Sequence, residues 1–227
     1  MTINIATFIP KDGEIQSATM LFSLILNSKS KLNIYITHRH NIDENKFKFI
    51  SKFGDKVNLE FIQVNYVTES ENIMRIPSLI SEDKLIYLKC NCIVLKDLTE
   101  LYNKDVSTIA LSQFNTAVLL LNMNYLVNSE FIKESEKYIN KYNEKKIFDS
   151  ILGNNITHLS VKFNLPNERE ILDNMIVVDG ADVLNRFEEI NNPYIISYTK
   201  IPWTIRYVLY QDIWKQYYKE YNLINNM

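Results

Sequence analysis

The chain has 227 residues, a length that fits one large domain or two small ones. Its composition, 46% hydrophobic and 23% charged, is typical of a globular protein and excludes a disordered or fibrous one. A net charge of −2 argues against a general binder of nucleic acids or anionic membranes. No apolar run approaches the length of a transmembrane helix, and residues 1–14 lack the pattern of a secretory signal. We therefore expect a cytoplasmic protein.

The first half of the chain alternates between strand-like and helix-like segments. Strands are predicted at residues 3–8, 32–37, 58–64, 84–88 and 92–95. Helices are predicted at residues 15–26, 44–53 and 73–80, the second ending at Gly54. This alternation predicts an α/β domain with a largely parallel sheet. Because no repeat or Pro/Gly-rich linker interrupts the sequence, we expect a single domain over residues 1–227.

The second half is more mixed. Residues 114–121 are predicted as a strand that is too apolar for either side to face solvent. Residues 125–142 have helical spacing, with Lys and Glu on the outer face. A short strand is predicted at residues 175–178, followed by the start of a helix at 179–182. Cys90 and Cys92 would share one face of a strand, where a bridge would be strained, so we interpret both as small residues filling a packed strand.

An aromatic helix is predicted at the C-terminal end, over residues 203–223. Its aromatic residues alternate at spacings of four and three, which puts them on one helical face: Trp203, Tyr207, Tyr210, Trp214, Tyr217 and Tyr221. One interpretation is that this face packs on the domain. The other is that four of its residues form an interface with a partner: Tyr210, Trp214, Tyr217 and Tyr221. A membrane contact is the weaker alternative, because few basic residues lie in this segment.

The segment that carries most information about function is residues 84–102, KLIYLKCNCIVLKDLTELY. Its two apolar strands, followed by Asp97-Leu98 and a short helix ending in Leu101-Tyr102, resemble glycosyltransferase family 8. Members of that family are retaining enzymes with a GT-A fold that use a nucleotide sugar and a divalent metal. Further landmarks of the family follow in order: residues 20–27, Arg75-Ile76-Pro77, residues 114–118, Lys162-Phe163-Asn164 and residues 195–203. The resemblance implies a GT-A-like domain, with a mixed, mostly parallel sheet flanked by helices.

The sequence departs from the family where the family binds its metal and its donor. Two carboxylates of an Asp-x-Asp motif and a later His hold the metal there, and the matching positions here are Lys89, Asn91 and Ser197. A lysine has three donors and no acceptor, so it cannot ligate a cation. The Asp-Gln-Asp near the donor sugar aligns roughly with residues 144–146, and the Gly and Lys of the C-terminal landmark appear as Lys200 and Ile201. We therefore expect no metal cofactor.

Charge supports a second interpretation. Lys89 and Asn91 sum to about +1 without a metal, and Arg75 and Lys200 are expected nearby. A cationic pocket could still bind the diphosphate of a nucleotide sugar, because lysine is a common partner of phosphate. Asn115 matches a family position that contacts the donor sugar, although it could equally cap a strand end.

Two hypotheses follow from the resemblance and its departures. In the first, the chain is a pseudo-glycosyltransferase, a non-catalytic accessory or binding protein in saccharide assembly. Its partner would be an active glycosyltransferase or a second copy of itself, in a homo-oligomer. In the second, the chain is a metal-independent hexosyltransferase in which Lys89 replaces the cation. The fold cannot decide between them, because function depends on the site.

Overall fold

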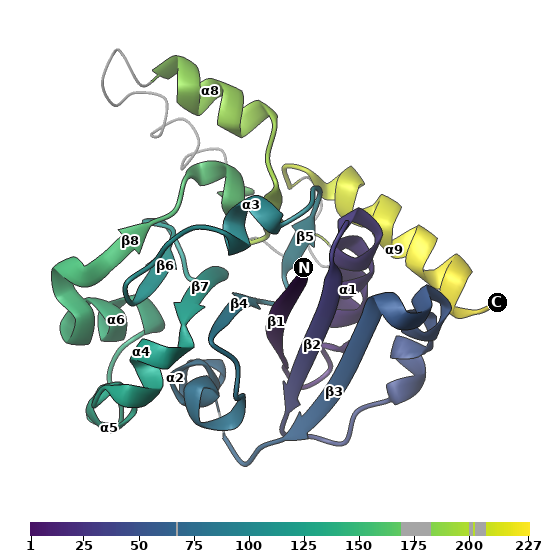
Figure 1. Cartoon of the computed structure of the whole chain (residues 1–227). Helices are drawn as coiled ribbons and strands as arrows, with labels where there is room; N and C mark the ends of the chain where they lie inside the picture. Colours follow the sequence, from purple (N-terminus) through teal and green to yellow (C-terminus); the bar gives the residue numbers. More distant parts are fainter. Residues whose placement is uncertain (67, 169–182, 200–201, 203–207) are drawn as a thin grey trace.

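The structure is a computed structural model that describes residues 1–66, 68–168, 183–199, 202 and 208–227. It has three layers, with a central sheet between two groups of helices (Figure 1). Among the helices of these residues, none combines the length and the apolar character needed to cross a membrane.

The central sheet has seven strands in the order β3-β2-β1-β4-β7-β6-β8. Strands β1 to β4 are mutually parallel, β7 runs antiparallel to both of its neighbours, and β6 is parallel to β8. This arrangement confirms the expected mixed, mostly parallel sheet. The strands are β1 (Thr2–Ile9), β2 (Lys31–His38), β3 (Val57–Gln63), β4 (Lys84–Leu88), β6 (Ile109–Leu111), β7 (Val118–Asn122) and β8 (Ile156–His158).

Two apolar cores separate the sheet from its helices. The first core lies under α1 (Glu14–Asn27), the 3-10 helix η1 (Glu44–Lys56) and α9 (Gln211–Asn225). The second core lies on the other face, under α2 (Glu69–Leu79), α4 (Met123–Asn128), α5 (Phe131–Ser135) and α6 (Glu144–Leu152). Figure 1 shows the first group beside β1 to β3 and the second group beside β4 to β7. Burial on both faces explains why the central strands are apolar throughout.

The structure also contains a second, smaller sheet. It has the order β5-β10-β9, built from β5 (Cys92–Val94), β10 (Ile195–Ser197) and β9 (Leu165–Pro166). Its antiparallel β5–β10 pair brings residues 92–94 against residues 195–197. The remaining elements are α3 (Thr99–Tyr102), η2 (Gly153–Asn155), η3 (Val161–Phe163) and α8 (Val183–Asn191).

Several predicted elements differ from the structure. The strand predicted at residues 114–121 begins only at Val118, because the Asn115 side chain accepts a hydrogen bond from the Ala117 amide and turns the chain. The helix predicted at 125–142 is divided into α4 and α5 by a turn at Ser129. Strand β6 was not predicted, since three residues carry too little periodicity. The strand predicted at 175–178 and the helix start at 179–182 lie outside the described residues.

In the C-terminal segment, α9 begins at Gln211, after Tyr210 with a φ of 60°. Residues 203–207 of the predicted helix, with Trp203 and Tyr207, lie outside the described residues. Trp214 and Tyr221 are buried in the domain, and the Tyr217 hydroxyl accepts a 2.8 Å hydrogen bond from Asn27 on α1. The Tyr198 hydroxyl donates to the Tyr210 carbonyl at 2.8 Å. These contacts correspond to the packed interpretation of the aromatic face. A partner that uses this face stays a prediction.

Candidate functional site

The topology of the central sheet singles out the end of β4. Strands β2 and β3 lie on one side of β1, whereas β4 lies on its other side. In open α/β sheets, ligands bind at the carboxyl ends of the strands where the strand order reverses in this way. Lys89, Cys90 and Asn91 directly follow β4 and connect it to β5. The segment singled out by the sequence therefore lies where the fold favours a binding site.

Lys89 lies between two carboxylates at this position. Its Nζ atom is 3.3 Å from Oε1 of Glu144 on α6 and 3.6 Å from Oε2 of Glu69 on α2. The side chains are largely enclosed, with exposed fractions of 18% for Lys89, 14% for Glu144 and 29% for Glu69. We call these three residues the Lys89 cluster. The sequence predicts a net charge of about +1 at this position, from Lys89 and Asn91. With Glu69 and Glu144 ionised beside Lys89, the net charge is −1.

Neutral hydroxyl groups hold the two carboxylates in place. Ser70 donates a 2.7 Å hydrogen bond to Oε1 of Glu144, and Thr116 donates to Oε2 at 3.3 Å. The Tyr87 hydroxyl, at the buried end of β4, donates to Oε1 of Glu69 at 2.8 Å. Glu69 and Glu144 both lie in the first turn of their helices, where the helix dipole favours a negative charge.

Burial and mutual attraction shift the pKa values of the cluster. Burial by itself lowers the pKa of Lys89, but the two neighbouring carboxylates outweigh it, and the net pKa is raised. Burial raises the pKa of Glu69, and the attraction of Lys89 only partly opposes this. For Glu144 the balance is reversed, because Lys89 and Ser70 together outweigh burial and lower its pKa. Both carboxylates, Glu69 and Glu144, therefore favour the charged ammonium form of Lys89.

A buried amide network lies beside the cluster. Asn91 donates from Nδ2 to the Tyr198 carbonyl at 3.0 Å. Asn115 donates from Nδ2 to the Ser197 hydroxyl at 3.2 Å, and its Oδ1 accepts a 2.8 Å bond from Asn164. The structure thus brings together three of the predicted site residues from distant parts of the chain. Two acceptors in the network, Oδ1 of Asn91 and Oδ1 of Asn164, are buried without a hydrogen-bond partner among the described residues.

The other two predicted site residues do not join this group. The Arg75 guanidinium lies 3.1 Å from Oε1 of Glu136 and 5.3 Å from the centre of the Tyr66 ring. It also lies within 3.7 Å of Glu71, one turn earlier on α2. Its recorded contacts are thus to α2, α5 and Tyr66 rather than to Lys89. Lys200 lies outside the described residues.

The residues at this site do not fit a divalent cation. Such cations require several oxygen ligands, and the ammonium of Lys89 already lies between the two carboxylates that could supply them. Asn91 uses its amide nitrogen toward Tyr198, and Ser197 offers only a hydroxyl. Within the residues that the structure describes, no group of three or more His, Cys, Asp or Glu side chains could hold a metal.

Sequence reasoning missed Glu69, one of the two partners of Lys89, and the two hydroxyl groups that donate to Glu144. Glu69, Ser70 and Thr116 come from two separate segments, and only the tertiary structure brings them together. Glu144 was reached through the rough alignment of residues 144–146 with a family landmark near the donor sugar. In the sequence, Glu144 could have been noted because its charge is opposite to that of Lys89, which stands where the family resemblance implies a carboxylate.

Comparison with known proteins supports the fold. No protein-family profile matches the chain. The chain is 22% identical over 227 residues to a putative glycosyltransferase of Haemophilus influenzae, in an alignment that covers 75% of this chain and 66% of that protein. The glycosyltransferase GlyE of Streptococcus pneumoniae superposes with a TM-score of 0.81 at 18% identity, covering all of this chain and 62% of GlyE.

Two further solved structures are similar. The bifunctional glycosyltransferase WbbM gives a TM-score of 0.82 at 12% identity, over 98% of this chain and 51% of WbbM. The galactosyltransferase LgtC, solved with donor and acceptor sugar analogues, gives 0.73 at 15% identity, over 100% of this chain and 95% of LgtC. The chain thus has a GT-A-like fold and is glycosyltransferase-like in sequence. It spans less than two thirds of GlyE and about half of WbbM.

Proposed function

We propose that the chain is a family 8-like pseudo-glycosyltransferase, a non-catalytic accessory or binding protein in saccharide assembly. The observation that carries this proposal is the Lys89 cluster. An ammonium held by two carboxylates stands at the position where the family resemblance implies a metal. Its charge is neutralised by its own chain, so it has little remaining attraction for a diphosphate.

The cluster also affects the chemistry of group transfer. A departing diphosphate needs positive charge to stabilise it in the transition state. For Lys89 to supply that charge, its ammonium would have to leave Glu144 and Glu69, and two carboxylates would then face the developing negative charge. This repulsion opposes catalysis at the carboxyl end of β4.

A metal-independent hexosyltransferase is the second candidate, and one observation favours it. The buried acceptors Oδ1 of Asn91 and Oδ1 of Asn164 have no partner among the described residues, and buried acceptors are normally satisfied. A hydroxyl group of a donor sugar could satisfy Oδ1 of Asn91, a residue that is only partly buried, whereas Asn164 is fully enclosed by the chain. In that case Asn115 and Ser197 would help to orient the sugar, and Lys89 would contact the diphosphate.

Thermal unfolding with UDP-, GDP- and CMP-sugars, each with Mn²⁺ and with EDTA, separates the two functions. A ligand at about 100 times its Kd stabilises by roughly 2.7 kcal/mol. For a domain of this size that corresponds to a rise in Tm of about 5–10 °C. We expect no rise with any sugar nucleotide. A rise that persists in EDTA would favour the hexosyltransferase, and a rise that requires Mn²⁺ would contradict the lost metal site.

Turnover provides the second measurement. Hydrolysis or transfer of a nucleotide sugar in EDTA, abolished in Lys89→Ala, would establish the enzyme and refute the accessory role. Lys145→Ala is the matched control, because Lys145 lies on the same helix as Glu144 and its ammonium forms an ion pair with Asp149. Loss of activity in both variants would point to a general effect of removing positive charge.

A further inference from the structure

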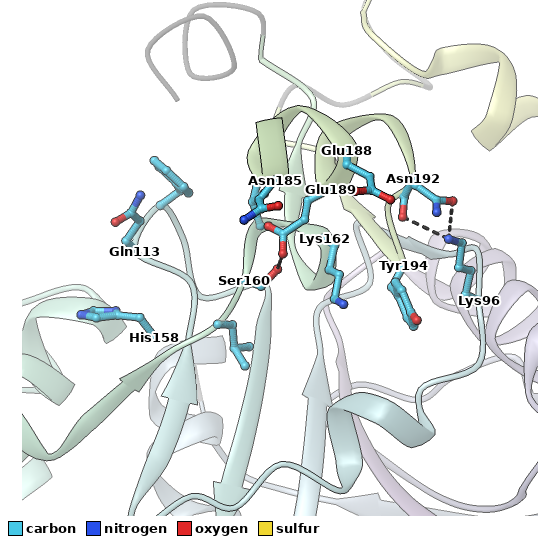
Figure 2. Close-up of a pocket in the computed structure, with 13 residues that line it drawn as sticks. Lys96, Gln113, His158, Ser160, Lys162, Asn185, Glu188, Glu189, Asn192 and Tyr194 are labelled. Atoms are coloured by element: carbon cyan, nitrogen blue, oxygen red, sulfur yellow. Dashed lines mark hydrogen bonds between the residues drawn. The ribbon is translucent and has the colours of Figure 1, made fainter. Parts of the chain in front are cut away.

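A groove of about 710 Å³ lies apart from the Lys89 cluster (Figure 2). One side is formed by Gln113 and Phe114, which follow β6, and by residues 158–162 at the end of β8. The other side is formed by α8 and by Lys96 and Tyr194, at the outer end of the β5–β10 pair. None of its lining residues belongs to the Lys89 cluster or to the buried amide network. Its volume falls within the range of roughly 300–1,000 Å³ for small-molecule sites.

Among the described residues, three of the four charged side chains that line the groove contact other groups of the chain, and Glu188 is the exception. The Lys162 ammonium is 2.8 Å from Oε1 of Glu100, and the Lys96 ammonium donates to the carbonyl of Asn192 at 3.1 Å and to its side chain. Glu189 accepts a 2.6 Å hydrogen bond from Ser160. The two lysines and two glutamates that line the groove also cancel in formal charge. This electrostatic balance disfavours a phosphate or another anion as the ligand.

Four polar side chains of the groove carry no recorded hydrogen bond or ion pair to any residue that the structure describes: Gln113, His158, Asn185 and Glu188. Figure 2 shows Gln113 and His158 on one side of the groove and Asn185 across from them on α8. Amide side chains donate and accept hydrogen bonds at once, as does a neutral imidazole. The Glu188 carboxylate only accepts hydrogen bonds, and its negative charge repels an anion. The ligand that matches this set must therefore combine donors with acceptors and carry no negative charge. A sugar hydroxyl group has both properties.

We propose that this groove binds a neutral oligosaccharide, through Gln113 and His158 on one side and Asn185 and Glu188 on the other. The proposal rests on the proposed function, because it supplies the saccharide that a non-catalytic protein of this fold would hold. The paired lysines keep Tyr194 and Asn192 in position, since the Lys96 and Lys162 ammonium groups lie 4.9 Å and 5.2 Å from the centre of the Tyr194 ring. The groove thus combines an aromatic ring that contacts two lysines with four exposed polar side chains that are available to a ligand.

Titration calorimetry and saturation-transfer NMR with lactose, maltose and N,N′-diacetylchitobiose test the proposal on the whole chain. The test variant combines Gln113→Ala with Asn185→Ala. The matched control combines Gln63→Ala with Asn226→Ala, which removes one exposed Gln and one exposed Asn elsewhere. We expect at least one disaccharide to bind and the test variant to weaken it about ten-fold, as expected for the loss of two hydrogen bonds. The control should bind as the unmodified chain does.

Three results would overturn the groove as a saccharide site: no binding of any of the disaccharides at millimolar concentration, equal binding in the test variant, or displacement of the disaccharide by UDP. The last would locate the sugar in a nucleotide-sugar site. Failure of this inference is distinguishable from failure of the proposed function. Turnover of a nucleotide sugar would refute the accessory role whatever the groove binds, whereas absent saccharide binding without turnover would refute only the groove.

Discussion

The ammonium of Lys89 lies 3.3 Å from Oε1 of Glu144, a residue 55 positions later in the chain. This contact joins the loop after β4 to the first turn of α6, across the carboxyl edge of the sheet. Glu69 on α2 completes the arrangement from the other side. A position that the family resemblance assigns to metal binding is thus part of an ionic contact within the chain.

Replacing Lys89 by Ala should destabilise the fold. The variant leaves Glu69 and Glu144 close together without their counter-charge, and breaking a buried pair in this way costs about 3–5 kcal/mol. Because the Lys89 side chain is 18% exposed, we expect a smaller loss of about 1–3 kcal/mol. The Tm should therefore fall by roughly 2–12 °C in calorimetry. Lys145→Ala, at an exposed pair, should leave the Tm nearly unchanged. Equal Tm values for the two variants would contradict a stabilising cluster.

The two glutamates should affect stability with opposite dependence on pH. The folded pKa of Glu144 is lowered below its ordinary value of 4.5, so its contribution is present above that value and is lost as the pH falls through the folded pKa. Glu144→Gln should therefore be less stable than the unmodified chain at pH 7, with the difference shrinking in acid. Urea unfolding from pH 3 to pH 8 measures this difference.

Glu69→Gln should show the reverse trend over the same pH series. The folded pKa of Glu69 is raised above 4.5, so its stabilising contribution is complete below that value and is lost as the pH rises through the folded pKa. The free energy of unfolding of the variant, relative to the unmodified chain, should therefore increase with pH. The amide keeps an acceptor for the Tyr87 hydroxyl. Parallel trends in the two variants would show that the carboxylates are not distinguished by their surroundings.

Trp214→Ala should unfold the chain at a much lower temperature. The indole is 4% exposed and stacks on the Tyr218 ring, with centroids 5.1 Å apart. Loss of a buried Trp costs about 3–5 kcal/mol, which corresponds to a fall in Tm of roughly 6–20 °C. Leu223→Ala, with 60% exposure on the same helix, is the control. If Trp214→Ala instead dissociated an oligomer without lowering the Tm of the monomer, the interface interpretation would replace the packed one.

Neither cysteine should react with iodoacetamide in the folded protein at pH 7. Burial raises the pKa of the Cys90 thiol to about 12 and raises that of Cys92 further, so the reactive thiolate is scarce. Mass spectrometry should find no adduct before unfolding and two after denaturation in guanidinium. Rapid labelling of Cys90 in the native protein would show that the loop after β4 opens.

The sequence alone predicted the elements that depend on local patterns. Strand β4 was predicted with its observed bounds, since a lysine followed by four apolar residues between polar segments leaves little choice. Residues 114–117 were assigned wrongly, because an apolar composition does not reveal that Asn115 turns the chain through a hydrogen bond. The aromatic spacing predicted a helical face in the C-terminal segment and left open whether it packs on the domain or meets a partner; Trp214 and Tyr221 are buried in the domain.

The sequence by itself determined that Lys89 and Asn91, in the segment that resembles the family motif, carry no carboxylate, because a residue type fixes which atoms can donate and accept. Only the tertiary structure decided what Lys89 does. The positive charge belongs to the Lys89 side chain alone, but the carboxylates that it attracts are those that the fold brings within 4 Å of it. Glu69 and Glu144 come from two helices separated by four strands in the chain, and no local pattern links them to Lys89. Electrostatic interactions depend on distance in space, and sequence separation does not determine that distance.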